Sequence, residues 1–130
     1  MPRSAKKPTR SKLVKKLDTV FSQYIRLRNA DAKGMAKCFT CGKVDHWKRL
    51  QAGHFQSRRH YSTRWDEDNV QVQCCKCNMF NQGEQYTFAK NLGLDLAESL
   101  SLKTQKLVKF SIVDLQEMYE HYQKEVKKLS

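Results

Sequence analysis

Apolar side chains recur at three- and four-residue steps in the first quarter of the chain, starting at Leu13. This spacing is that of one face of an α-helix, and it predicts a helix from about Ser11, with Gly34 ending the segment. Arg26 and Arg28 lie off the apolar stripe. We expect the stripe to be buried in the core. It consists of Leu13, Leu17, Val20, Phe21, Tyr24 and Leu27.

Residues 38–77 have little helical periodicity, and the pattern favours short strands there. We predict one strand near Leu50–Phe55 and another near Val70–Gln73. The polar segment Gln56–Asn69 between them is expected to be a loop. This part of the chain is therefore predicted to contain a strand, a loop and a second strand.

Helical periodicity returns after the second strand. We expect helices over about 78–91, which Gly93 would end, and over 94–102. The most regular stretch is 111–129, where the apolar residues form a heptad-like seam shorter than three heptads. The seam could pack on the N-terminal helix, or it could join two copies in a homodimer. Its members are Ile112, Leu115, Tyr119, Tyr122, Val126 and Leu129.

The mixture of helical and extended segments predicts a small α+β fold. With 130 residues and 39% hydrophobic side chains, the chain has the length of one domain and a modest core. Residues 1–10 contain both prolines and are expected to be a disordered basic arm. A single domain would follow over 11–130, with a helix at 11–34, a central unit at 38–92 and C-terminal helices at 94–130.

Positive charge is concentrated toward the N-terminus. The net charge is +12, and the first 17 residues carry seven Lys or Arg and no acidic residue. Such charge suits a polyanion, nucleic acid first and an anionic membrane second, although the arm could also be a solvated tail. No apolar run approaches the roughly 18 residues of a membrane span, and no signal-peptide core follows the basic start, so we expect a cytoplasmic protein without membrane contacts. The candidate DNA contacts are Lys6, Lys7, Arg10, Lys12, Arg26, Arg28, Arg58, Arg59 and Arg64.

Four of the five cysteines form two C-x-x-C pairs, Cys38 with Cys41 and Cys74 with Cys77. A two-residue gap lets a tight turn aim both thiolates at one ion, and two such turns complete a tetrahedral site for structural Zn²⁺. Cys75 is then the spare thiol. His46 could replace a thiolate, but four well-spaced cysteines make this unnecessary.

Residues suited to phosphodiester hydrolysis follow one another in the order His54, Asn69, Asn78. Hydrolysis needs a base for water and a cation for the charge that grows on phosphate. A neutral histidine suits the base, Asn69 could orient its ring, and the Asn78 amide oxygen suits Mg²⁺ or Mn²⁺. Each residue also has a structural alternative: a packed or surface histidine, a turn asparagine, a helix N-cap, and a solvated arginine loop.

The motifs that carry these residues resemble the NinG family of phage recombination proteins, also called Rap. They are C-F-T-C-G, A-G-H-F-x-S-R and D-N-V-x-x-Q-C-x-x-C-N, and the resemblance covers residues 12–129. More distantly, the chain is similar to HNH endonucleases and to phage endonuclease VII, a Holliday-junction resolvase. This resemblance implies an HNH-like ββα-metal core with the four cysteines on zinc, His54 as general base, Asn69 as the middle residue of the pattern and Asn78 on the catalytic ion.

One position departs from the HNH pattern. Many HNH enzymes carry Asp or His directly before the base, as a ligand of the catalytic ion, and this chain has Gly53 there. Asp68 could supply the missing ligand, and so could Asp45, Glu67 or His60. Water could also fill the coordination shell.

The resemblance implies a metal-dependent endonuclease in the cytoplasm of a bacterial host. Its substrates would be branched DNA, such as Holliday junctions and D-loops, or duplex DNA, and a homodimer would suit a junction with two strands to cut. One alternative is a zinc-dependent nucleic-acid-binding module without catalysis, for which Gly53 would mark a lost active site. Another is a zinc domain that binds other proteins through the C-terminal seam.

Overall fold

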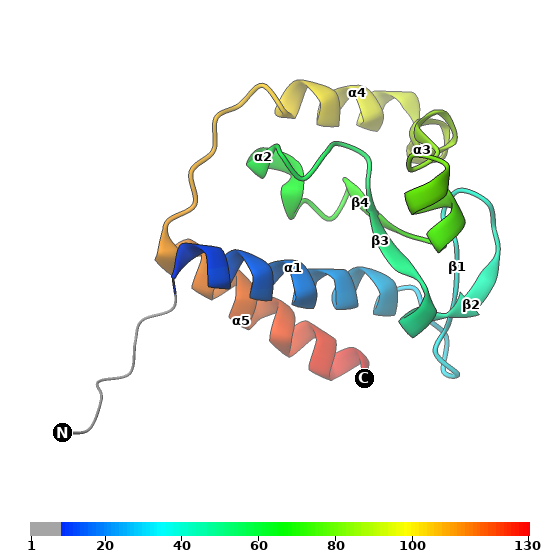
Figure 1. The fold of residues 1–130 in the computed structure, drawn as a ribbon, viewed down its shortest axis with the longest axis horizontal. Coiled ribbons are helices and arrows are strands. Elements are labelled where there is room, and N and C mark those ends of the chain that lie inside the picture. The colour runs from blue at the N-terminus through cyan, green and yellow to red at the C-terminus, as the bar shows by residue number, and fades with distance from the viewer. Residues whose placement is uncertain (1–8) are drawn as a thin grey trace.

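The computed structural model describes residues 9–130. The predicted basic arm, with Lys6 and Lys7, therefore lies almost wholly outside the described residues. The elements are α1 (Arg10–Leu27), β1 (Met35–Lys37), β2 (Val44–His46), β3 (Gln51–His54), α2 (Tyr61–Arg64), β4 (Val70–Gln73), α3 (Gln85–Leu92), α4 (Leu94–Lys103) and α5 (Ile112–Leu129). Short 3₁₀- and π-helical turns occupy Trp47–Arg49 and Lys76–Phe80. The α+β class is thus confirmed, with α1 and α5 on one side of β3 and β4 and with α3 and α4 on the other (Figure 1).

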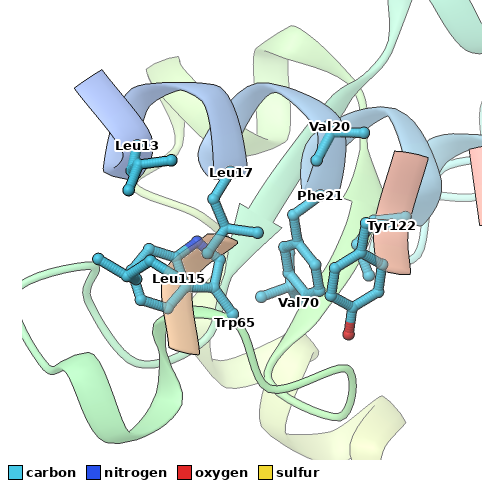
Figure 2. Packing of buried hydrophobic residues seen from close by; sticks show 9 residues of the cluster. Leu13, Leu17, Val20, Phe21, Trp65, Val70, Leu115 and Tyr122 are labelled. Carbon is cyan, nitrogen blue, oxygen red and sulfur yellow. The ribbon is translucent and has the colours of Figure 1, made fainter. Parts of the chain in front are cut away.

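The predicted N-terminal helix is confirmed at its start as α1, which begins one residue early because the Thr9 side chain caps it by accepting from the Lys12 N–H. Its predicted end at Gly34 is wrong: α1 ends at Leu27, and Gly34, at φ +79°, lies in the loop before β1. The apolar stripe of α1 is buried as predicted, except that Tyr24 is half-buried, and Ile25 is buried as well. The stripe packs on Leu115 and Tyr122 of α5 and on Trp65 and Val70 (Figure 2). The α1–α5 contact therefore forms the larger of the two cores.

The C-terminal seam packs within the chain. Ser111 and Asp114 form a capping box at the start of α5, and the Tyr122 ring meets the Phe21 ring edge-on at 4.9 Å between centroids. Only Leu115 and Tyr122 are fully buried in α5, while Ile112 and Leu129 remain exposed. The seam is thus used on α1, and homodimer formation stays a prediction.

Two antiparallel hairpins make up the sheet structure. The β3–β4 hairpin matches the two predicted strands, although β3 ends at His54 rather than at Phe55, and it pairs His54 with Val70 and Gly53 with Gln71. The β1–β2 hairpin was not predicted, because strands of three residues carry almost no periodicity. The one-turn helix α2 also interrupts the predicted loop.

The helix predicted over 78–91 is wrong in its first half. The π-helical turn ends at Phe80, and a regular helix resumes only at Gln85. Between them Gly83 lies at φ +79°, with its N–H on the Cys77 carbonyl, so the chain reverses here instead of continuing the helix. The following helix is confirmed as α4. No helix in residues 9–130 is long and apolar enough to cross a membrane.

Candidate functional site

The four paired cysteines converge at one point. The sulfur atoms of Cys38, Cys41, Cys74 and Cys77 all lie within 4.8 Å of one another. Cys38 and Cys41 belong to the turn between β1 and β2, and Cys74 and Cys77 follow β4. Four thiolates at this separation fit one tetrahedral Zn²⁺ ion, so the predicted four-cysteine site is a site that could hold zinc.

The remaining candidates for this site lie outside the cluster. The Cys75 thiol contacts the Met79 sulfur at 3.7 Å, and the His46 ring stacks on Trp47. Burial raises the pKa of the Cys38 thiol. Hydrogen bonds from the Thr40 hydroxyl and from nearby backbone groups together lower it by more, so the resulting pKa is about 6. The pKa values of Cys41 and Cys77 are raised in the same cluster, for Cys77 mainly by burial, so Cys38 is the thiol of these three that ionises most readily.

A cavity of about 590 Å³ lies beside the cysteine cluster, between α1, β3 and the segment 78–85. His54 and Asn78 both line it, so the structure brings together two of the three predicted catalytic residues. Asn69 and Asp68 do not line it. The other lining residues are Asp18, Phe21, Ser22, Arg26, Leu50, Gln51, Ala52, Arg58, Gln82, Gly83 and Gln85.

One nitrogen of His54 is held by the backbone. Its Nε2 atom lies 2.9 Å from the carbonyl oxygen of Arg64. A carbonyl can only accept, so Nε2 carries the proton and Nδ1 is left as the basic nitrogen. Burial lowers the pKa of His54, and the Arg64 carbonyl opposes this to a smaller extent. The ring is therefore neutral and correctly polarised for a general base.

The Asn69 side chain forms no hydrogen bond with the His54 ring among the described residues. This wholly buried side chain donates to the carbonyls of Gln56 and Thr63 and accepts from the Gln56 N–H. The orientation of His54 that we expected of Asn69 is thus performed by Arg64, the residue after Thr63. Asn69 fixes the loop that presents this carbonyl.

Asn78 is held by its nitrogen end. Its Nδ2 atom donates to Oε1 of Gln51 at 2.8 Å, and its backbone N–H donates to the Cys74 carbonyl. The Oδ1 atom makes no hydrogen bond within residues 9–130. Asn78 lies inside the π-helical turn and caps no helix, so the N-cap alternative does not apply. Its amide oxygen is available to a cation.

The carboxylates considered as replacements for a ligand at Gly53 lie elsewhere. Asp68 is exposed and outside the cavity, Asp45 pairs with Arg49 at 2.7 Å, and Glu67 accepts from Tyr24 and Tyr122. His60, the remaining candidate, precedes α2 and does not line the cavity either.

Asp18 of α1 is a cavity residue that the sequence did not indicate. Its carboxylate accepts from Nε and Nη2 of Arg64 at 3.1 and 2.6 Å and from the Trp65 indole. Nothing in its spacing sets it apart from any polar residue on a helix, because its partners lie 46 and 47 residues further along the chain.

The predicted DNA-contact residues fall into two groups. Arg28 and Arg64 bind inside the protein: Arg28 donates to the carbonyls of Glu67 and Val70, and Arg64 pairs with Asp18. These two are occupied by structural contacts. Arg26 lines the cavity, but its Nε and Nη1 already donate to the carbonyls of Ser22 and Trp47. The second group reaches the cavity or the surface and consists of Arg58 at the cavity, with Arg10, Lys12 and Arg59 exposed.

Gly53 has no space for a side chain. A Cβ atom built there would lie 1.7 Å from Oε1 of Gln73, whose side chain is completely buried. That oxygen has no hydrogen-bond partner among the residues that the structure describes. An orphaned amide oxygen of this kind is the type of donor that Mg²⁺ or Mn²⁺ prefers.

Comparison with known proteins agrees with the motifs. A family model described as "Bacteriophage Lambda NinG protein" matches residues 2–130. The chain therefore belongs to the NinG family, which is linked to phage recombination. Neither a curated protein nor a solved structure matches the chain.

Proposed function

We propose that this chain is a metal-dependent DNA endonuclease that cuts branched DNA, such as Holliday junctions and D-loops, during phage recombination. The observation that carries the proposal is the convergence of His54 and Asn78 in one cavity, with the His54 ring fixed by the Arg64 carbonyl. Membership of a recombination-linked family supplies the substrate class.

The residues that line the cavity have different roles in the proposed hydrolysis. Nδ1 of His54 takes a proton from a water molecule, which then attacks phosphorus in line with the leaving 3′ oxygen. Asn78 is suited to bind Mg²⁺ or Mn²⁺, which supplies stabilisation of the charge that develops on the phosphate. Arg58, exposed at the same opening, is placed to bind a non-bridging phosphate oxygen. The products are a 5′-phosphate and a 3′-hydroxyl.

The zinc centre has a structural part in this scheme. Asn78 directly follows Cys77, so a rigid four-thiolate cluster fixes the backbone that presents the Asn78 amide. Gln51 then fixes the amide itself. The ligand is thereby oriented before the ion arrives, which lowers the cost of ordering it.

The second candidate function is a zinc-dependent nucleic-acid-binding module, and Gly53 favours it because the position lacks a metal-binding side chain. A cleavage assay separates the two. A labelled four-way junction and the matching linear duplex are incubated with Mg²⁺, Mn²⁺ or EDTA, using wild type and His54→Ala. Junction cutting that needs the metal and is lost in the variant supports the nuclease. Tight junction binding without cutting under any metal supports the binding module.

A further inference from the structure

The side chain of Gln73 on β4 fills the space that a side chain at Gly53 on β3 would occupy. Gln73 ends β4 opposite Gln51, and its side chain crosses to the space beside Gly53. No residue larger than glycine fits at 53 unless Gln73 moves, because even a Cβ atom would overlap its Oε1. The buried position of the Gln73 amide therefore requires a glycine at position 53.

The orientation of the Gln73 amide follows from its neighbours. The Gly83 carbonyl, 2.9 Å away, can only accept, so it must face Nε2; the Thr40 hydroxyl also receives a hydrogen bond from Nε2, at 3.1 Å. Oε1 therefore faces Gly53. A buried acceptor without a partner is rare in folded proteins and calls for an explanation such as an ion.

The free oxygen lies on the face of β3 that holds Asn78. Gln51 and Gly53 are alternate residues of β3 and share a face, and Gln51 accepts from the Asn78 amide. Gln73 is wholly buried and does not itself line the cavity, but Gly83, which holds its nitrogen end, lines the cavity with Asn78. Two amides are thus fixed through their nitrogens, and each has an oxygen without a hydrogen bond in residues 9–130.

We propose that Oε1 of Gln73 is a ligand of a hard divalent cation, Mg²⁺ or Mn²⁺, together with Oδ1 of Asn78, and that it takes the place of a side chain at position 53. This inference rests on the cavity of the proposed function and names a second protein ligand for it. Both ligands are neutral, so the protein alone binds the ion weakly, and a DNA phosphate adds the negative charge.

The first test uses the unmodified, zinc-loaded full chain without DNA. Mg²⁺ is titrated while the side-chain amide signals of glutamine and asparagine are followed by NMR. The amides of Gln73 and Asn78 should shift along one saturation curve, and that of Gln71, on the same strand, should stay in place. A Gln73 signal that does not respond while Asn78 shifts would overturn the proposal.

The second test exchanges the two positions. Mn²⁺ binding is measured by electron paramagnetic resonance for wild type, Gln73→Met, the matched control Gln71→Met, and the double variant Gly53→Asp with Gln73→Ala. Gln73→Met should weaken Mn²⁺ binding at least about tenfold, as losses near a metal typically do, and the control should not. The double variant should restore binding, because a carboxylate then enters the vacated space.

These results also separate the proposal from the proposed function. Zinc content and circular dichroism show which variants fold, and the NMR titration decides the matter if Gln73→Met does not. If wild type cuts DNA and Gln73→Met keeps its Mn²⁺ affinity, the ligand assignment fails and the nuclease stands. If Mn²⁺ binding depends on Gln73 and no DNA is cut, the ligand assignment stands and the nuclease fails.

Discussion

Asp18 of α1 binds the side chain of Arg64 through two hydrogen bonds, of which the Nη2–Oδ2 contact is 2.6 Å long. The backbone carbonyl of the same Arg64 holds Nε2 of His54. The hydrogen bond to Asp18 raises the pKa of Arg64 and keeps its guanidinium charged. A carboxylate on the first helix therefore fixes the backbone atom that orients the proposed base.

Asp18→Ala should slow cleavage more than it weakens binding. The Arg64 side chain would lose its partner, the carbonyl would drift, and a displaced base costs between about ten- and a hundredfold in rate. Stability should fall by about 1–3 kcal/mol, the range for a lost charged hydrogen bond. Single-turnover cleavage, DNA affinity and thermal unfolding give the three readouts. Asp95→Ala, in the first turn of α4, is the control, and an unchanged cleavage rate in Asp18→Ala would remove the carboxylate from the positioning scheme.

The pH dependence of cleavage should report the depressed pKa of His54. Burial lowers this pKa, so the base form persists below the usual value of about 6.5. The rate should rise with pH through a midpoint that lies below that value. Protonation favours the unfolded chain, so the stability that the neutral ring contributes is present above about pH 6.5 and is lost as the pH falls through the lowered pKa. Single-turnover rates between pH 5 and 8 test this, and a titrating limb centred above 6.5 would contradict it.

The parts of the fold that the sequence predicted are those with long periodic patterns. The stripe from Leu13 to Leu27 and the helices α4 and α5 could be read from spacing alone, because many residues repeat the same signal. The β1–β2 hairpin could not, since its strands have three residues each. The break after Phe80 escaped as well, because the sulfur cluster and Gly83 override a sequence that is compatible with a helix.

The candidate site also contains residues that a local sequence pattern indicates and residues that it does not. Cysteine spacing and the His54 and Asn78 motifs are local signals, and the structure brings those residues together. The Arg64 carbonyl is a backbone group, so no residue type could reveal its role. The proposed role of Gln73 could not be predicted from the sequence, because it depends on the space that Gly53 leaves on the neighbouring strand of the hairpin. Roles that rest on contacts distant in sequence needed the three-dimensional arrangement.

Loss of one zinc-site cysteine should unfold the central region. Cys77→Ser removes a buried thiolate from the cluster and releases the turn that carries Asn78. Metal binding contributes a large part of the folding free energy in a domain of this size, so we expect loss of bound zinc and a much lower melting temperature. Zinc content and circular dichroism measure both. The neighbouring Cys75→Ser is the matched control and should keep one zinc per chain; equal zinc content in the two variants would refute the four-cysteine assignment.

Arg58→Ala should weaken DNA binding in a way that depends on salt. The Arg58 side chain is 63% exposed at the cavity, and its 4.0 Å contact with Asp18 is loose, so its guanidinium is free to meet a phosphate. Loss of one phosphate contact should lower the slope of log affinity against log salt by about 1, for junction and duplex alike. Arg49→Ala is the control, because the Arg49 side chain is similarly exposed, at 69%, but pairs with Asp45 outside the cavity. Because counterion release scales with the number of phosphates contacted, a slope that is the same in Arg58→Ala and wild type would place the DNA backbone away from this opening.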